Sequence, residues 1–334
     1  VLNEEKNLSD QMEVVALCEK NQTTIDNLWE EKILHEGVTI YSDFDEMLDS
    51  GIDAVVLANY FHEHAKYAIK AMKKGVAVLS ETTAAPSLGE CVQLVEAYEE
   101  TKTKYMLGAN CVFWRVVQAM RRVMDEGKFG RAVFGDAEYL HPSVPNSTPN
   151  PRIPSSGKPL DLENLHWRNT LPCCYYNMHD LGPMMYITNS FPKSVSGRAV
   201  FNDFARKKTV GHAKAFALVE MDNGSMINYS GCTSAGSLSK WYRLACETGT
   251  IESVRYDQSE YKLIECGVPD GPTITEHTWT SSGTLNAEEE AILNKSMSAD
   301  SEHGGVPHGG VDFALMVHFL KYLRDEEQPF FDVY

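Results

Sequence analysis

The chain has 334 residues, of which 43% are hydrophobic and 23% are charged, and its formal net charge is −17 at pH 7. This length and composition predict a globular protein of two domains. The acidic balance disfavours nucleic acids and anionic membranes as partners, because both need a basic surface, and no run of about 18 apolar residues predicts a membrane-spanning helix.

The eight cysteines are scattered along the chain without a C-x-x-C pair, and Cys173 and Cys174 are adjacent. This pattern predicts reduced, mostly buried thiols rather than disulfides or a metal site. The chain begins with Val-Leu-Asn rather than Met, so we expect the native N-terminus to be absent. A cytoplasmic location is expected, and export stays open.

Residues 1–110 alternate short apolar runs with amphipathic helices. Strands are predicted at 12–20, 37–43, 52–59, 75–81 and 104–110, and helices at 21–34, 44–51, 62–75 and 87–102. Buried strands separated by helices are typical of a parallel sheet with helices on both faces. We therefore expect an α/β, Rossmann-type dinucleotide-binding domain in residues 1–110.

The pattern changes after residue 110. A helix at 114–127 leads to strands at 132–141, 194–200, 213–221, 225–233, 242–248 and 250–257. A hairpin turn is predicted at 222–224, a long loop of a kind that is often functional at 142–172, and a closing helix at 311–327. These features predict an α+β substrate-binding domain in residues 111–334 with an open, mainly antiparallel sheet. That sheet is also the expected surface for a homo-oligomer.

Polar residues follow three of the predicted parallel strands. Glu19 ends the first, Asn59 and Phe61 follow the third, and Glu81 ends the fourth. Ligands of a parallel sheet bind at this edge, and an acid at the position of Glu19 bonds ribose hydroxyls and repels a 2′-phosphate, which favours NAD over NADP. The alternatives are exposed acids, helix caps and, for His64, an ordinary residue of a first helical turn.

The glycine loop of a dinucleotide site is absent from the sequence. No G-x-G-x-x-G is present, although such a loop normally holds the pyrophosphate at a helix N-terminus. If residues 12–20 are the second strand of the domain, that loop lies before Val1. We therefore expect the first strand and much of the first helix to be missing from this chain.

Residues 64–83 resemble the glucose–fructose oxidoreductase / inositol dehydrogenase (Gfo/Idh/MocA) family. Members carry H-x-x-x-A-x-x-A-x-x-x-G, here His64 to Gly75, and then a strand ending in E-K-P, here Glu81-Thr82-Thr83. The resemblance implies that the dehydrogenases of the family use this lysine in acid–base chemistry. Thr82 does not replace it, because an alkyl hydroxyl does not titrate near neutral pH, so ordinary alcohol dehydrogenation is disfavoured.

The rest of the chain is similar to one branch of that family, glycoside hydrolase family 109, the NAD-dependent α-N-acetylgalactosaminidases. The motifs that recur in the same order are YMLGAN (105–110), AEYLH (137–141), HWR (166–168), YNMHDLGP (176–183), GT (249–250), HGGVDF (308–313) and DVY (332–334). The branch has Y-x-T-H-G-L-G-P at 176–183 and continues past D-V-Y. Both ends of this chain are therefore expected to be clipped.

The resemblance implies a glycosidase that works by transient oxidation with a tightly held NAD. Hydride leaves sugar C3, a base then takes the acidified C2 proton, the C1 group departs, water adds and the hydride returns. Tyr176 and His179, three residues apart at the start of a helix, are the predicted catalytic pair. Histidine titrates near neutral pH, whereas a tyrosine needs a neighbouring charge to act as a base. The two roles are not assigned individually.

The remaining candidates are placed around the sugar and the cofactor. Tyr139, His141, Asp180 and His308 are predicted to bind substrate, and Asn110, Trp167 and Arg168 to bind the cofactor or line the sugar pocket. Ordinary packing is the alternative for the aromatic residues, and a helix cap is the alternative for Asp180. Two other functions stay open: an NAD-dependent sugar or cyclitol dehydrogenase, which releases stoichiometric NADH, and a non-catalytic sugar- or dinucleotide-binding protein.

Overall fold

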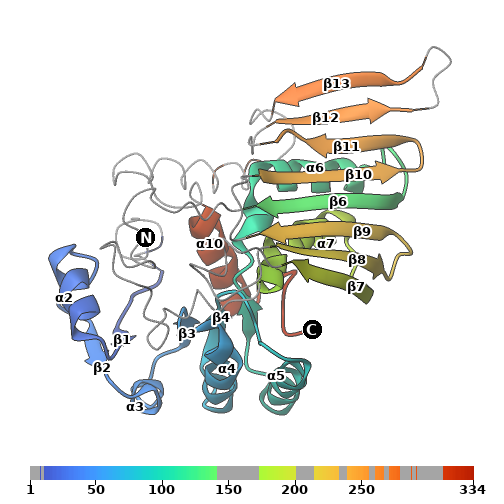
Figure 1. Cartoon of the computed structure of the whole chain (residues 1–334). Helices are drawn as coiled ribbons and strands as arrows, with labels where there is room; N and C mark the ends of the chain where they lie inside the picture. Colours follow the sequence, from blue (N-terminus) through green and yellow to red (C-terminus); the bar gives the residue numbers. More distant parts are fainter. Residues whose placement is uncertain are drawn as a thin grey trace, which may run out of the picture. The chain divides into compact units, whose positions relative to one another are not determined.

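The computed structural model describes residues 8, 11–140, 173–200, 214–232, 239–255, 260–266, 271–278, 287, 291 and 311–334. The chain forms two compact units (Figure 1). The first unit is Val1–Gly108 together with Ile292–Tyr334, and the second is Ala109–Ala291. The first unit carries parallel strands, and the second carries one large mixed sheet.

The described part of the first unit contains five parallel strands in two groups. β1 (Ala16–Cys18) pairs with β2 (Thr39–Tyr41), and β3 (Ala54–Leu57), β4 (Ala77–Ser80) and β5 (Tyr105–Leu107) pair in that order. The helices are α2 (Gln22–Glu30), α3 (Phe44–Leu48), α4 (His64–Lys73) and α5 (Leu88–Thr101). In the usual doubly wound order, 3-2-1-4-5-6, one further strand lies between two such groups, and none of the described residues forms it.

Side-chain caps fix the points at which helices of this unit begin. Asn21 Oδ1 accepts a hydrogen bond at 3.0 Å from a backbone N–H of the first turn of α2. At α5, Glu90 N donates to Ser87 Oγ at 3.3 Å, and the Ser87 hydroxyl donates to Glu90 Oε2 at 2.6 Å. The S-x-x-E pattern of this second cap is a known sequence signal for a helix start, which explains why the predicted helix at 87–102 has the correct beginning.

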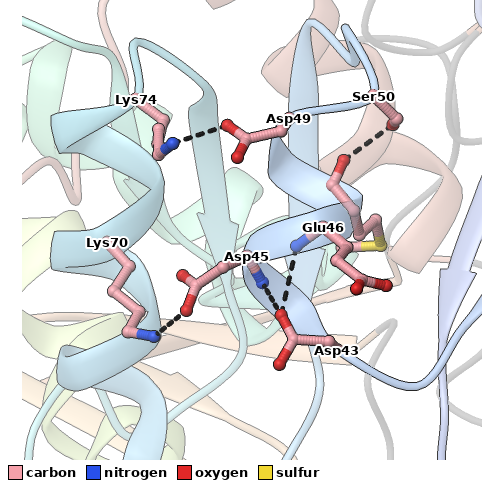
Figure 2. A network of polar contacts seen from close by, with 8 residues as sticks. Asp43, Asp45, Glu46, Asp49, Ser50, Lys70 and Lys74 are labelled. Carbon is pink, nitrogen blue, oxygen red and sulfur yellow. Dashed lines mark hydrogen bonds and ion pairs between the residues drawn. The ribbon is translucent and has the colours of Figure 1, made fainter.

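Two ion pairs join α3 to α4 (Figure 2). Lys70 Nζ lies 2.5 Å from Asp45 Oδ2, and Lys74 Nζ lies 2.5 Å from Asp49 Oδ1. Beside them Asp43 caps α3, because its Oδ1 accepts hydrogen bonds from two backbone N–H groups of the first turn. Water screens these exposed pairs, so they orient the two helices more than they stabilise the unit.

The last helix, α10 (Val311–Leu323), belongs to the first unit. Lys104 Nζ, next to β5, donates to Tyr322 O at 2.6 Å, across 218 positions of sequence. Leu107 N donates to Phe331 O at 2.9 Å. The sequence placed this helix in the second domain, whereas these long-range bonds, which no local pattern reveals, attach it to the parallel strands.

An eight-stranded sheet is the centre of the second unit. Its order is β13-β12-β11-β10-β6-β9-β8-β7, with β6 and β9 parallel and every other neighbouring pair antiparallel. The strands are β6 (Ala132–Leu140), β7 (Pro192–Val200), β8 (Lys214–Met221), β9 (Met226–Cys232), β10 (Ser239–Cys246), β11 (Gly249–Ser253), β12 (Glu260–Glu265) and β13 (Thr273–Thr278). The described helices are α6 (Arg115–Asp125) and α7 (Leu181–Thr188), with short 3₁₀ turns η2 (Asn110–Phe113) and η4 (Cys173–His179).

Helices cover one face of this sheet (Figure 1). α7 packs against β6 and β9, and the side chains of Tyr139 and Leu244 on this face are buried. At Gly135 a Cβ would lie 2.4 Å from Met184 Cε and 2.9 Å from a backbone oxygen of β10. Glycine is therefore required where α7 crosses β6.

The opposite face of the sheet has no cover among the described residues. Phe134, Phe216 and Leu218 on this face are 45%, 43% and 49% exposed. The ion pair between Arg243 Nη2 and Asp136 Oδ2, at 2.6 Å, crosses the same face between β10 and β6. This face therefore combines exposed apolar side chains with a paired charge.

Three further observations concern the described residues only. None of their helices has the length and apolar character needed to cross a bilayer. No three His, Cys, Asp or Glu side chains among them gather closely enough to bind a metal ion. The cysteines that are described with their side chains are free thiols: Cys18, Cys91, Cys111, Cys174, Cys246 and Cys266.

Candidate functional site

The carboxyl ends of the strands in the first unit carry residues that the sequence assigned to a dinucleotide. Glu19 follows β1, and its Oε1 accepts hydrogen bonds from Lys20 N at 2.7 Å and Asn21 N at 2.8 Å. These backbone donors, which precede α2, hold the carboxylate at the end of the strand. A carboxylate in this place is an acceptor for ribose hydroxyls.

Asn59 and Glu81 lie at the ends of the next two strands. Asn59 follows β3, and its Nδ2 and Oδ1 atoms are buried without a hydrogen-bond partner among the described residues. Glu81 directly follows β4; its N donates to Leu57 O at 2.9 Å, and its side chain is exposed. Because a buried amide without partners costs free energy, Asn59 is the residue at this edge with the clearest need for a polar ligand.

Phe61 and His64 are buried near these strand ends, at 7% and 1% exposure. His64 Nδ1 lies 2.8 Å from Thr83 O, and Nε2 lies 3.2 Å from Asn59 O. Burial lowers the pKa of His64, which favours the neutral ring with a single N–H. A neutral ring donates only one hydrogen bond, and the shorter contact, between Nδ1 and Thr83 O, links the start of α4 to the segment after β4.

The second unit brings the predicted catalytic pair together with a third ring. Tyr176 and His179 lie in η4, and Tyr139 lies in β6. The Tyr139 and Tyr176 rings are stacked, with centroids 6.3 Å apart and planes at 4°, and the His179 ring lies 4.7 Å from Tyr139 and 5.3 Å from Tyr176. Burial, with the Tyr176 hydroxyl nearby, raises the pKa of Tyr139. Tyr139 therefore stays protonated and serves as a wall beside the pair.

Two buried aromatic residues that sequence reasoning did not single out support this cluster. The Tyr242 hydroxyl, from β10, donates to His179 O at 2.6 Å. The Trp114 ring, just before α6, lies 6.4 Å from the rings of both Tyr139 and His179. Each is an aromatic residue in an apolar strand or helix pattern, and that signal is equally typical of ordinary core.

Asp180 is wholly buried and caps α7. Its Oδ1 accepts a hydrogen bond from Leu181 N at 2.7 Å, whereas its Oδ2 is buried without a partner among the described residues. Burial raises the pKa of this carboxyl well above its ordinary value of 3.8. Of the two roles expected for Asp180, the structure shows the helix cap, and substrate contact stays a prediction.

Lys240 is a cation in the same cluster that the sequence analysis missed. It lies in β10 directly opposite Tyr139 of β6, and its Nζ is 4.4 Å from the centroid of the Trp114 ring. The predicted strand began only at Tyr242. Side chains of a strand alternate between its two faces, so Lys240, two residues before Tyr242, lies on the same buried face as Tyr242. A lysine without a partner is rare on a buried face.

The other predicted site residues fall in two groups. Asn110 begins η2, immediately after β5 and Gly108-Ala109, and is 8% exposed. His141, Trp167, Arg168 and His308 lie outside the described residues.

Comparison with known proteins identifies the first domain. Residues 2–109 match the family model GFO_IDH_MocA, described as an oxidoreductase family with an NAD-binding Rossmann fold. Residues 2–109 are a Gfo/Idh/MocA oxidoreductase domain. The predicted fold, an NAD-binding Rossmann-type domain followed by a domain with a mainly antiparallel sheet, is confirmed, as is the expectation of an enzyme of this NAD-dependent oxidoreductase fold.

The similarity to known proteins extends beyond the Gfo/Idh/MocA domain. A glycosyl hydrolase family 109 protein of Stenotrophomonas maltophilia is 24% identical over 97% of this chain and 78% of its own length. An alpha-N-acetylgalactosaminidase of Shewanella oneidensis is 23% identical over 97% of this chain and 73% of its own length. The WlbA dehydrogenase of Bordetella pertussis, solved with NADH and UDP-GlcNAcA, superposes with a TM-score of 0.70 at 16% identity over 97% of this chain and 84% of that one. The first two confirm the resemblance to glycoside hydrolase family 109, and the third confirms the fold.

NAD is the cofactor of this family, and the edge of the Gfo/Idh/MocA domain fits it in part. The carboxylate of Glu19 and the unpartnered amide of Asn59 are polar groups at strand ends where such a cofactor binds. The sequence has no G-x-G-x-x-G, so no loop of that type is available in this chain to hold the pyrophosphate.

Proposed function

We propose that the protein is an NAD-dependent glycoside hydrolase that acts on a sugar by transient oxidation, elimination and water addition. The observation that carries the proposal is the single cluster of Tyr176, His179 and Tyr139 in the second unit. The relatives named as family 109 hydrolases and an alpha-N-acetylgalactosaminidase, which align with 97% of the chain, support this reaction over a simple oxidation.

When bound, NAD⁺ supplies a reversible hydride acceptor for sugar C3. We assign Glu19 to the adenosine ribose hydroxyls, and Asn59 and Glu81 to polar groups of the cofactor at the ends of β3 and β4. Phe61 and Asn110 line the cofactor in this proposal, and His64 holds the backbone around it through its contact with Thr83 O.

The acid–base steps fall to Tyr176 and His179. We assign the proton of the C3 hydroxyl to His179, because an imidazole accepts a proton near neutral pH. The C2 proton is assigned to Tyr176, whose ring is held in place by its stack on Tyr139. The bond from Tyr242 to His179 O fixes the end of η4 and therefore the direction of the imidazole.

Turnover of p-nitrophenyl α-N-acetylgalactosaminide with NAD⁺ in D₂O tests this proposal. We expect nitrophenol release without net NADH absorbance, and deuterium at C2 of the released sugar. Tyr176→Phe keeps the stacked ring and should lower turnover by about 10²–10⁴-fold. The control Tyr67→Phe, in α4 with its ring against Phe44 of α3, should not change it.

The alternatives give different results in the same assay. One NADH per sugar consumed supports a sugar or cyclitol dehydrogenase and contradicts the glycosidase. Neither turnover nor C2 exchange, with binding retained, supports a non-catalytic sugar- or dinucleotide-binding protein.

We also propose that a second copy of this chain covers the outer face of the eight-stranded sheet. The face carries the exposed side chains of Phe134, Phe216 and Leu218 beside the Arg243–Asp136 pair. A self-complementary surface needs this mixture of apolar area and balanced charge. Sedimentation of the wild type as a dimer or larger, and of Leu218→Asp as a monomer, is the expected result; a monomeric wild type contradicts it.

A further inference from the structure

The position of Lys240 in its strand brings its ammonium group to the aromatic cluster. Lys240 of β10 is the direct cross-strand partner of Tyr139 of β6, so the two side chains lie on the same face of the sheet. Its Nζ lies 4.4 Å from the centroid of the Trp114 ring and 5.8 Å from that of Tyr139. Since Tyr139 in turn stacks on Tyr176, the ammonium group and the proposed sugar-acting residues share one cluster.

The charge of Lys240 is not balanced within the described part of the chain. No described carboxylate pairs with its Nζ, and burial lowers its pKa. Three other lysines show the opposite behaviour, because hydrogen-bonded carboxylates raise the pKa of Lys70, Lys193 and Lys262. Lys240 therefore combines a pKa lowered by burial with a place beside the aromatic cluster and no carboxylate among the described residues, and this combination favours an anionic ligand.

The nearby groups do not supply the missing negative charge. Burial raises the pKa of the Cys111 thiol, which is the group that acts on Lys240 electrostatically, and so keeps that thiol neutral. Burial likewise keeps the Tyr139 hydroxyl protonated. The Trp114 ring stabilises the ammonium in part through its π-face, but an aromatic ring does not replace a carboxylate as a hydrogen-bond acceptor.

We infer that Lys240 binds a carboxylate of the substrate, so that the sugar accepted by the second unit is an acidic one, a uronic acid. This inference rests on the proposed function only in that the same cluster binds the sugar. A carboxylate would form a charge-assisted hydrogen bond with Nζ, and the half-buried ring of Tyr176 offers an apolar face for the sugar ring. The local cation also offsets the repulsion that an acidic protein exerts on an anionic ligand.

Binding of two matched probes tests the inference. The probes are methyl α-D-galacturonoside and methyl α-D-galactoside, titrated by saturation-transfer NMR with and without NAD⁺. We expect the wild type to bind the uronoside roughly tenfold more tightly, as one charge-assisted hydrogen bond provides. In Lys240→Met, which keeps an apolar stem against Trp114, the two affinities should become equal, and in Lys240→Arg the preference should persist.

Lys214→Met is the matched control. Lys214 is also half-buried over an aromatic ring, with its Nζ 4.5 Å from the Phe216 centroid, but it lies on the opposite face of the sheet, as the strand register shows. Lys214→Met removes the same charge from the chain as Lys240→Met and should leave the preference for the uronoside unchanged.

Several results would overturn the inference. The first is a wild type that binds both probes equally, and this result does not depend on the folding of any variant. A preference that survives in Lys240→Met, or that Lys214→Met removes equally, is another. Loss of binding of both probes in both Lys240→Met and Lys240→Arg would instead indicate a structural role for Lys240 and contradict the inference. Uronoside preference without turnover of p-nitrophenyl α-galacturonoside refutes the proposed hydrolase and leaves the carboxylate site standing. Turnover of the neutral p-nitrophenyl glycoside without uronoside preference refutes the carboxylate site and leaves the hydrolase standing.

Discussion

Replacement of Asp180 by asparagine is expected to stabilise the protein at neutral pH. The carboxyl is fully buried, with Oδ1 accepting the Leu181 N–H at 2.7 Å and Oδ2 without a partner among the described residues. Asparagine keeps the acceptor that caps α7. Its amide also occupies the place of the protonated oxygen without carrying charge, so the two neutral side chains are close equivalents.

The size of the effect follows from proton linkage. Burial raises the folded-state pKa of Asp180 well above the ordinary 3.8, so the folded protein retains a proton that the unfolded chain releases. The stabilising contribution of the neutral carboxyl is complete below the unfolded pKa and is lost as the pH rises to the folded pKa, by about 1.4 kcal/mol per pH unit. Asp180→Asn does not undergo this loss. The difference in the free energy of unfolding between Asp180→Asn and wild type should therefore be near zero at pH 4 and grow as the pH rises to the folded-state pKa of Asp180.

Urea unfolding of wild type and Asp180→Asn, at intervals from pH 4 to pH 8, measures this difference. Asp43→Asn is the matched control, because Asp43 also caps a helix but is exposed, and its backbone hydrogen bonds lower its pKa. Asp43→Asn should therefore lose stability relative to wild type at neutral pH and recover it on acidification. An Asp180→Asn protein that is less stable than wild type at pH 7, or a difference that does not grow with pH, would refute the reasoning.

The other predictions use the same unfolding assay. Tyr242→Phe should cost about 1–3 kcal/mol, because it leaves the buried His179 carbonyl without its donor; an unchanged midpoint would contradict the bond. Gly135→Ala should cost about 1–3 kcal/mol, since its Cβ would meet a strand oxygen at 2.9 Å, whereas Gly89→Ala, with nothing within 4 Å, should cost nothing. The wild type should lose stability as the pH falls below about 6.5, because burial lowers the pKa of His64 and the unfolded chain therefore takes up the proton first. His64→Gln should not show this loss, and identical pH profiles of the two proteins would contradict the prediction.

Local sequence patterns predicted much of the fold. The strand–helix alternation of the first hundred residues gave the parallel strands, since each buried run was bounded by a cap or a glycine. Asp222-Asn223-Gly224 predicted the hairpin that joins β8 and β9 in antiparallel pairing. The parallel pairing of β6 with β9 and the attachment of α10 to the first unit were not visible, because both depend on contacts between segments far apart in the chain.

Residue spacing alone predicts the candidate site only where its residues are neighbours in sequence, and Tyr139 was expected through the family resemblance. Tyr176 and His179 share one short segment, and their spacing alone brings them together. Tyr139 and Lys240 approach this pair from two different strands, and their relation depends on the register of β10 against β6. Register is a property of the folded sheet, so the place of Lys240 in the alternation, two residues before the predicted strand, did not reveal that it lies opposite Tyr139.

The local charge at this cluster differs from the charge of the chain as a whole. The net charge is −17, yet burial shifts the carboxyl of Asp180 towards its neutral form, while the ammonium of Lys240 has no described counter-ion. An acidic ligand that approaches the cluster therefore meets a positive group inside an otherwise repulsive protein. Because exposed charges are screened over about 10 Å at 0.1 M salt, whereas a partly buried pair is screened much less, added salt should weaken the long-range repulsion more than the contact at Lys240. The affinity for a uronic acid should consequently change little, or even rise, between low and moderate salt. A steep fall over that range would mean that the carboxylate binds at exposed surface charges and not at Lys240.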